Sequence, residues 1–61
     1  MYIIRVKQGG KWTRHAYVYA TEEMALARMR SFAKRPGVEH VDMIRVDKGG
    51  ENEVRQKIVR Q

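Results

Sequence analysis

The chain has 61 residues, and its 13 Lys and Arg against 7 Asp and Glu give a net charge of +6 at pH 7. This length predicts a single domain, residues 1–61, with too little interior for the deep, supported cleft that most enzymes need. The absence of cysteine excludes disulfides, thiolate nucleophiles and Cys-based zinc sites, and no apolar run reaches the ~18 residues of a membrane span. With no apolar leader, this composition predicts a cytoplasmic protein.

The first predicted strand covers residues 2–7, where apolar side chains alternate with others. Residues 8–10, Gln-Gly-Gly, predict a hairpin turn, because glycine adopts positive φ without a steric penalty. The return strand runs from about residue 11 to residue 20. The length of the turn decides which side of this strand faces the core.

Two registers are open for this hairpin. A two-residue loop places His15 and Tyr17 beside Ile4 and leaves Trp12 as an exposed anchor. A three-residue loop places the apolar side chains of both strands together, with Trp12, Ala16 and Val18 beside Tyr2, Ile4 and Val6. We expect the three-residue loop, because it makes one side apolar and the other polar. The polar side then carries Arg5, Lys7, Lys11, Thr13, His15, Tyr17 and Tyr19.

A helix is predicted from Thr21 to about Lys34. The Thr21 hydroxyl is suited to cap the first turn, and Glu22 and Glu23 favour the positive end of the helix dipole. Pro36 cannot continue the helix. Residues at helical spacing form one apolar face, which consists of Ala25, Leu26, Met29, Phe32 and Ala33. Met24 points away from this face.

The third predicted strand covers residues 38–48 and contains a near repeat of the first. Residues 44–50 match residues 4–10 at five of seven positions, ending in a second glycine pair. By this analogy Ile44 and Val46 should face the core, with Val41 and Met43 on the other side. A bulge near Asp42 would instead return Val41 to the core.

The last segment, residues 51–61, fits a strand or a helix, because its apolar residues are four apart. The repeat favours a strand, with a frayed end as the alternative for the last few residues. The predicted fold is therefore α+β, with the order strand-strand-helix-strand-strand. It forms a four-stranded antiparallel sheet of order 2-1-3-4, with one helix packed on one face.

The sequence offers little for catalysis, and a non-enzymatic protein is predicted. Ser31 has no histidine near it in the sequence, so a catalytic triad is not indicated. His40 and Asp42 are too few to hold a metal alone, and no cofactor is predicted. Both glycine pairs join strand to strand, whereas phosphate loops lead into a helix.

The positive charge lies in one part of the chain. Residues 1–36 hold eight basic and two acidic residues, for a net +6, and residues 37–61 hold five of each. This asymmetry suggests a polyanionic partner, which we expect to be nucleic acid, an acidic protein surface or anionic lipid. Rings on a sheet stack bases while cations meet phosphates, so the seven residues on the polar side of the hairpin predict a nucleic-acid site.

The middle of the chain resembles the phage-encoded inhibitor of bacterial RNA polymerase. Two segments carry the likeness over roughly residues 15–46. Tyr19-Ala20-Thr21-Glu22-Glu23 leads into Ala25-Leu26, and Pro36-Gly37-Val38-Glu39 leads into Ile44-Arg45-Val46. The resemblance implies a non-catalytic inhibitor or adaptor that occupies a host protein, such as RNA polymerase or another nucleic-acid enzyme. It assigns no binding residues.

Overall fold

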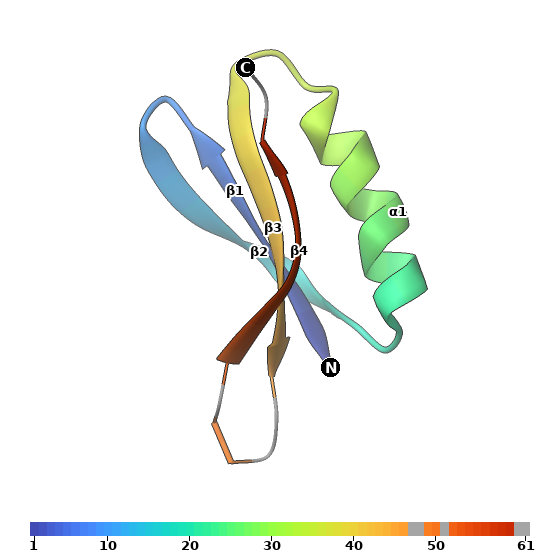
Figure 1. The fold of residues 1–61 in the computed structure, drawn as a ribbon. Helices are drawn as coiled ribbons and strands as arrows, with labels where there is room; N and C mark the ends of the chain where they lie inside the picture. The colour runs from blue at the N-terminus through green and yellow to red at the C-terminus, as the bar shows by residue number, and fades with distance from the viewer. Residues whose placement is uncertain (47–48, 51, 60–61) are drawn as a thin grey trace.

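The computed structural model describes residues 1–46, 49–50 and 52–59. Its elements in chain order are β1 (Tyr2–Gln8), β2 (Lys11–Tyr19), α1 (Glu22–Ala33), β3 (Val38–Val46) and β4 (Asn52–Val59). The strands form one antiparallel sheet in the order β2-β1-β3-β4, and α1 lies against one face of it (Figure 1). The predicted α+β fold, its strand order and the strand in the last segment are confirmed.

Two predictions fall on residues that the structure leaves undescribed. The third strand was expected to reach Lys48, and Asp47 and Lys48 are outside the described residues. A frayed end was the alternative to a strand for the last few residues, of which residues 60 and 61 are also outside the described ones. The remaining strand and helix bounds lie within a few residues of those expected from the sequence.

The ends of α1 follow the predicted capping signals. Thr21 has an extended backbone, and its Oγ1 accepts a hydrogen bond from the Met24 amide at 3.2 Å. Glu22 and Glu23 lie in the first turn, where the helix dipole favours negative charge. Gly37 takes a φ of +83°, so the chain turns from the helix end into β3 without backbone strain.

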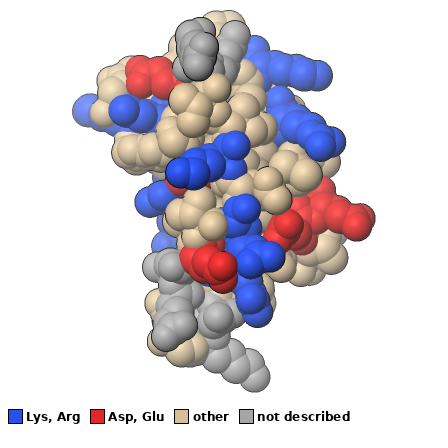
Figure 2. All heavy atoms as spheres, in the orientation of Figure 1, with Lys and Arg blue, Asp and Glu red and all other residues tan. Residues whose placement is uncertain are grey.

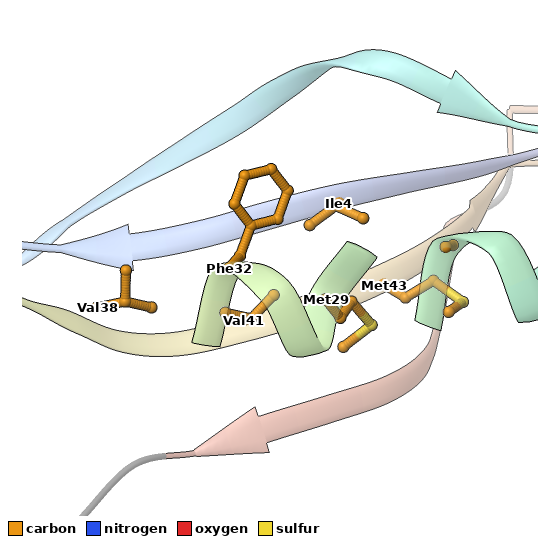
Figure 3. Packing of buried hydrophobic residues seen from close by; sticks show 7 residues of the cluster. Ile4, Met29, Phe32, Val38, Val41 and Met43 are labelled. Atoms are coloured by element: carbon orange, nitrogen blue, oxygen red, sulfur yellow. The ribbon is translucent and has the colours of Figure 1, made fainter. Parts of the chain in front are cut away.

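The core lies between α1 and the two central strands, β1 and β3. Met29 is fully buried and packs with Ile4, Val41 and Met43, each of which is also fully buried (Figure 3). The helix face is the predicted one, since Ala25, Met29 and Phe32 are buried while Leu26 and Ala33 pack partly buried against the cluster. Met24 points outward as expected, with 58% of its surface exposed.

The predicted inward side of β3 is wrong. Ile4 lies directly opposite Met43, and the same ladder places Val6 opposite Val41. Directly opposed residues share one face of a sheet, so Val41 and Met43 join the core and Ile44 faces the other side. Val41 needs no bulge to reach the core, because the pairing itself determines its face. The near repeat therefore marks two similar strands that present opposite sets of residues to the helix.

The predicted register of the first hairpin is also wrong. Gln8 pairs with Lys11, so the loop has two residues, and Gly9 and Gly10 take φ values of +60° and +78°. Two adjacent positive φ values are typical of the type I′ turn, whose twist matches that of the flanking strands. This turn removes the extra residue on which the expected register depended.

A bulge then follows in β2. Arg5 pairs with Arg14 but Ile3 pairs with Val18, so three residues of β2 lie opposite Ile4. The shift is by two residues, and the two sides of β2 therefore keep their identity along the strand. Odd-numbered side chains such as Tyr19 lie on the helix side. Trp12, Arg14 and Val18 lie on the opposite side, which is called the open face below.

Candidate functional site

The structure divides the predicted nucleic-acid residues between the two sides of the sheet. Arg5 and Lys7 lie on the open face, as expected. The other members were expected beside them, and this placement is wrong. The register puts Lys11, Thr13, His15 and Tyr19 on the helix side, and the Tyr17 ring lies against His15.

The two predicted site residues on the open face, Arg5 and Lys7, already have carboxylate partners. Arg5 donates from Nε to Asp42 Oδ1 at 2.9 Å, and its Nη2 donates to Asp42 Oδ2. These hydrogen bonds raise the pKa of Arg5 further above its ordinary value. Lys7 Nζ lies 3.9 Å from Glu39 Oε2, a looser and more exposed pair. Their charge is thus partly neutralised within the fold.

The rings on the helix side form a cluster centred on His15. Its ring centroid lies 5.3 Å from Tyr17, 6.4 Å from Tyr19 and 4.7 Å from Phe32, which meets it edge-on. Tyr19 is partly buried against the core, and its hydroxyl lies 3.5 Å from His15 Nδ1. Tyr17 is 66% exposed, so its ring is open to solvent. The Tyr19 and Phe32 rings of the same cluster are held in the fold, because both pack in or against the core.

Two arginines of α1 and the segment after it flank this cluster. The guanidinium carbon of Arg28 lies 5.8 Å from the centre of the Phe32 ring, and that of Arg35 lies 4.6 Å from it. Both distances are within the range of cation–π attraction. The sequence analysis missed these residues as site candidates. Their signal is their position four residues before and three after Phe32, which places them on one flank of the helix.

Two hollows lie along this flank. One of about 220 Å³ is lined by side chains that include His15, Phe32 and Arg35, and another of about 420 Å³ is lined by side chains that include Tyr19 and Arg28. No carboxylate of the described residues lines either hollow. The surface between β2 and α1 therefore combines rings with positive charge. We call it the aromatic-basic surface and define it by His15, Tyr17, Tyr19, Arg28 and Arg35.

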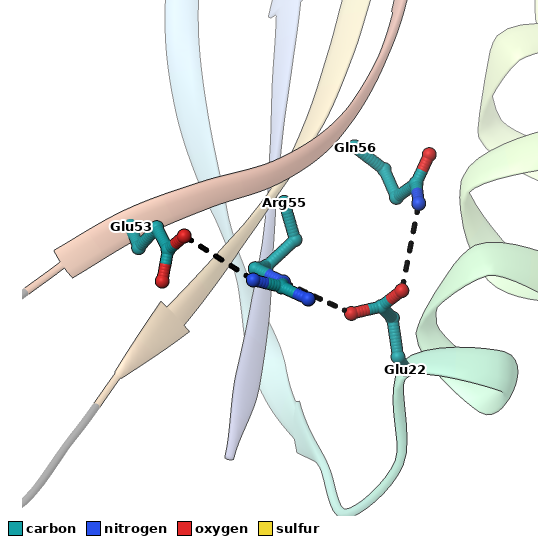
Figure 4. Close-up of polar contacts among 4 residues, drawn as sticks. All are labelled: Glu22, Glu53, Arg55 and Gln56. Carbon is teal, nitrogen blue, oxygen red and sulfur yellow. Dashed lines mark hydrogen bonds and ion pairs between the residues drawn. The ribbon is translucent and has the colours of Figure 1, made fainter.

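Two of the described acidic side chains, Glu22 and Glu53, take part in contacts at another edge of the sheet. Glu22 accepts hydrogen bonds from Arg55 Nε at 3.2 Å and from Gln56 at 3.4 Å, and Arg55 Nη1 also donates to Glu53 at 3.2 Å (Figure 4). These contacts tie the start of α1 to β4, the sheet edge opposite β2. Figure 2 shows the polarity of the helix, with red atoms where α1 begins and blue atoms along its upper part. Glu22 and Glu53 thus bind Arg55 at the β4 edge and do not line the two hollows of the aromatic-basic surface.

The structure brings together no metal site among residues 1–46, 49–50 and 52–59, where no three His, Cys, Asp or Glu side chains form a group. His40 lies against Trp12, with ring centroids 4.8 Å apart, and it has no cluster of ligands around it. In the described part of the chain no helix has the length and apolar character required to cross a membrane.

Comparisons with protein-family models, with curated proteins and with solved structures found no match for this chain. The resemblance to the phage-encoded inhibitor remains a prediction from the sequence.

The position of His15 predicts a pH dependence of folding. Burial, and then the nearby charges of Arg28 and Arg35, lower the pKa of His15 below its ordinary value of 6.5. Neutral His15 therefore contributes fully to the stability of the folded state above about pH 6.5. This stability is lost as the pH falls toward the lower pKa of the folded state, because the unfolded chain takes up the proton first. Urea unfolding between about pH 7.5 and 5 should show a smaller pH dependence for His15→Gln. An identical pH dependence in both proteins would contradict this role.

Proposed function

We propose that the protein is a small non-catalytic binding module whose aromatic-basic surface holds single-stranded nucleic acid. The observation that carries the proposal is the exposed Tyr17 ring beside His15, with Arg28 and Arg35 on the same flank and no described carboxylate in the adjoining hollows. Rings and cations at this spacing match the two chemical parts of a nucleotide, the base and the phosphate.

The division of roles follows from the exposure of each group. Tyr17 is free to stack an unpaired base, while His15, itself stacked on Tyr19, lies against its ring. Arg28 and Arg35 supply charge along a line beside the rings, where a strand backbone would run. A single strand is favoured over a duplex, because bases in a duplex are already stacked and paired.

Charge at the site is tested by the salt dependence of binding. Fluorescence anisotropy with labelled oligo-dT and oligo-U should show affinity that falls steeply with salt, because each neutralised phosphate releases counterions. Arg28→Ala and Arg35→Ala should each reduce the slope by about 0.7, the contribution of one phosphate contact on a single strand. Arg30→Ala is the matched control, since it removes the same charge from an exposed position elsewhere on α1.

The contribution of stacking is tested separately. Tyr17→Ala should weaken binding by about 1–3 kcal/mol and leave the salt slope unchanged, because the side chain carries no charge. Duplex DNA should be less sensitive to this change. A flat salt dependence, or no binding of any oligonucleotide at low salt, would contradict the proposal. That result would favour the alternative function, an inhibitor or adaptor of a host protein such as RNA polymerase.

A further inference from the structure

The open face of the sheet has a different chemistry from the aromatic-basic surface. No described helix covers it, and the cross-strand pairing brings aliphatic side chains from all four strands onto it. These aliphatic residues are Ile3, Val18, Ile44, Val46, Val54 and Val59. Val18, Val54 and Val59 are 51%, 47% and 61% exposed. Apolar area of this kind, gathered on one side of a small sheet, is typical of an interaction surface.

A hollow of about 280 Å³ lies in this face. Its floor is formed by Ile3, Ile44 and Val46, and the guanidinium-bearing side chains of Arg5 and Arg14 line it as well. Ile3 is nearly buried although it lies on the open side, so the floor is apolar and well packed. The hollow therefore offers an apolar binding surface, with the positive charges of Arg5 and Arg14 beside it.

Among the described residues of this face the cations Arg5, Lys7, Arg14 and Lys57 outnumber the exposed carboxylates, of which Glu39 is already paired with Lys7. Asp42, the carboxylate at its centre, is only 4% exposed and lies beneath Arg5. Arg14 and Lys57 are both exposed, and the register places them on the strands at the two edges of the sheet. An acidic partner would thus meet Arg14 and Lys57 at the two edges of the face, while Asp42 is buried and Glu39 is occupied by Lys7.

Two other occupants fit less well. A second copy of the chain, paired face to face, would bring the same cations against each other, and like charges in an interface are unfavourable. Unpaired bases stack on exposed rings, and Trp12, which is 44% exposed, is the large aromatic side chain that the described register places on this face. One side of its ring faces the Arg5 guanidinium at 5.0 Å, and His40 meets it edge-on at 4.8 Å. This ring is already engaged, whereas aliphatic side chains do not stack bases.

We propose that the open face docks a protein segment that carries apolar and acidic side chains in alternation. Apolar side chains of the segment would sit on the floor formed by Ile3, Ile44 and Val46, and its carboxylates would meet Arg5 and Arg14 at the border. This inference does not depend on the nucleic-acid proposal, because it uses the opposite side of the sheet. The two surfaces together would make the protein a connector between a nucleic acid and an acidic protein partner.

The test uses a defined probe, a capped peptide of eight residues that alternates Glu and Val, added to ¹⁵N-labelled protein. Amide signals of Ile3, Ile44 and Val46 should shift in a saturable way, while those of Tyr17 and Arg28 should not. A peptide that alternates Lys and Val should cause no such shifts. Arg14→Glu should weaken binding about tenfold, and Arg30→Glu, with the same change of net charge, should leave it unchanged.

Several outcomes would overturn this inference. Shifts confined to the aromatic-basic surface, or no shifts at millimolar peptide, would show that the open face does not recognise this chemistry. Equal binding of the Lys-Val peptide would contradict the role of charge. A dimer in sedimentation that buries the open face would assign the surface to a second copy instead. Tyr17→Ala should abolish oligonucleotide stacking but leave peptide binding intact, so the failure of either proposal is distinguishable from that of the other.

Discussion

Met29→Ala is expected to destabilise the protein by about 2–5 kcal/mol, because a fully buried side chain would be replaced by a cavity. Met29 lies in the middle of α1 and packs in the cluster that includes Ile4, Val41 and Met43. A domain of this size has a free energy of unfolding of only roughly 3–5 kcal/mol, so the variant should be largely unfolded at physiological temperature. Urea titration followed by far-UV circular dichroism measures the loss directly.

Met24→Ala is the matched control on the same helix. Met24 is 58% exposed and lies away from the cluster, so the same substitution should change the free energy of unfolding by no more than about 0.5 kcal/mol. If both variants lost similar stability, α1 would be rotated about its axis. Arg28 and Arg35 would then no longer flank Phe32, and the aromatic-basic surface would have to be redrawn.

The second large effect is expected at the ion pair on the open face. Arg5→Ala should destabilise the protein by roughly 2–3 kcal/mol, because it leaves the buried Asp42 carboxylate without its hydrogen-bond partner. The value is set below the ~3–5 kcal/mol of a fully buried pair because the Arg5 side chain is 38% exposed. Removing both partners in Arg5→Ala/Asp42→Ala should cost less than the sum of the two single changes.

Lys7→Ala provides the comparison for this pair. Lys7 lies two residues after Arg5 in β1 and is also on the open face. Its partner Glu39 is exposed, and the distance from Lys7 Nζ to Glu39 Oε2 is 3.9 Å. Exposed pairs of this kind contribute about 0–1 kcal/mol, so the change should be small. Chemical denaturation of the wild-type protein, the single variants Arg5→Ala, Asp42→Ala and Lys7→Ala, and the double variant at one pH measures these losses. Equal losses for Arg5→Ala and Lys7→Ala would show that burial of Asp42 does not make the central pair special.

Local sequence signals predicted the elements of this fold and their order. Thr21 with two following glutamates predicts the start of α1, and Pro36 with Gly37 predicts its end, because these residues act on the backbone of their own turn. The apolar spacing of the helix identifies its buried face for the same reason. Antiparallel neighbours with short loops then leave few alternatives for the sheet order, which the structure has as β2-β1-β3-β4.

The faces of the strands could not be predicted in this way. A strand with apolar residues on both sides, such as β3, satisfies either orientation locally, and the Gly9-Gly10 pair is compatible with loops of two or three residues. A change of one residue in the loop moves every side chain of β2 to the other side. Cross-strand pairing with β1 resolves both choices, and it is a contact between residues far apart in the chain.

The candidate site also combines features that are visible in the sequence with features that depend on the tertiary structure. The order of residues along the chain placed the positive charge in the first 36 residues, and the tryptophan and the three tyrosines on the first hairpin. Only the packing of α1 against β2 brought Phe32, with Arg28 and Arg35 beside it, to the ring of His15, and the register separated these groups from Arg5 on the open face. Charge and residue type are properties of single positions and can be read along the chain. Which of them share a surface depends on register and helix packing, which are properties of the whole fold.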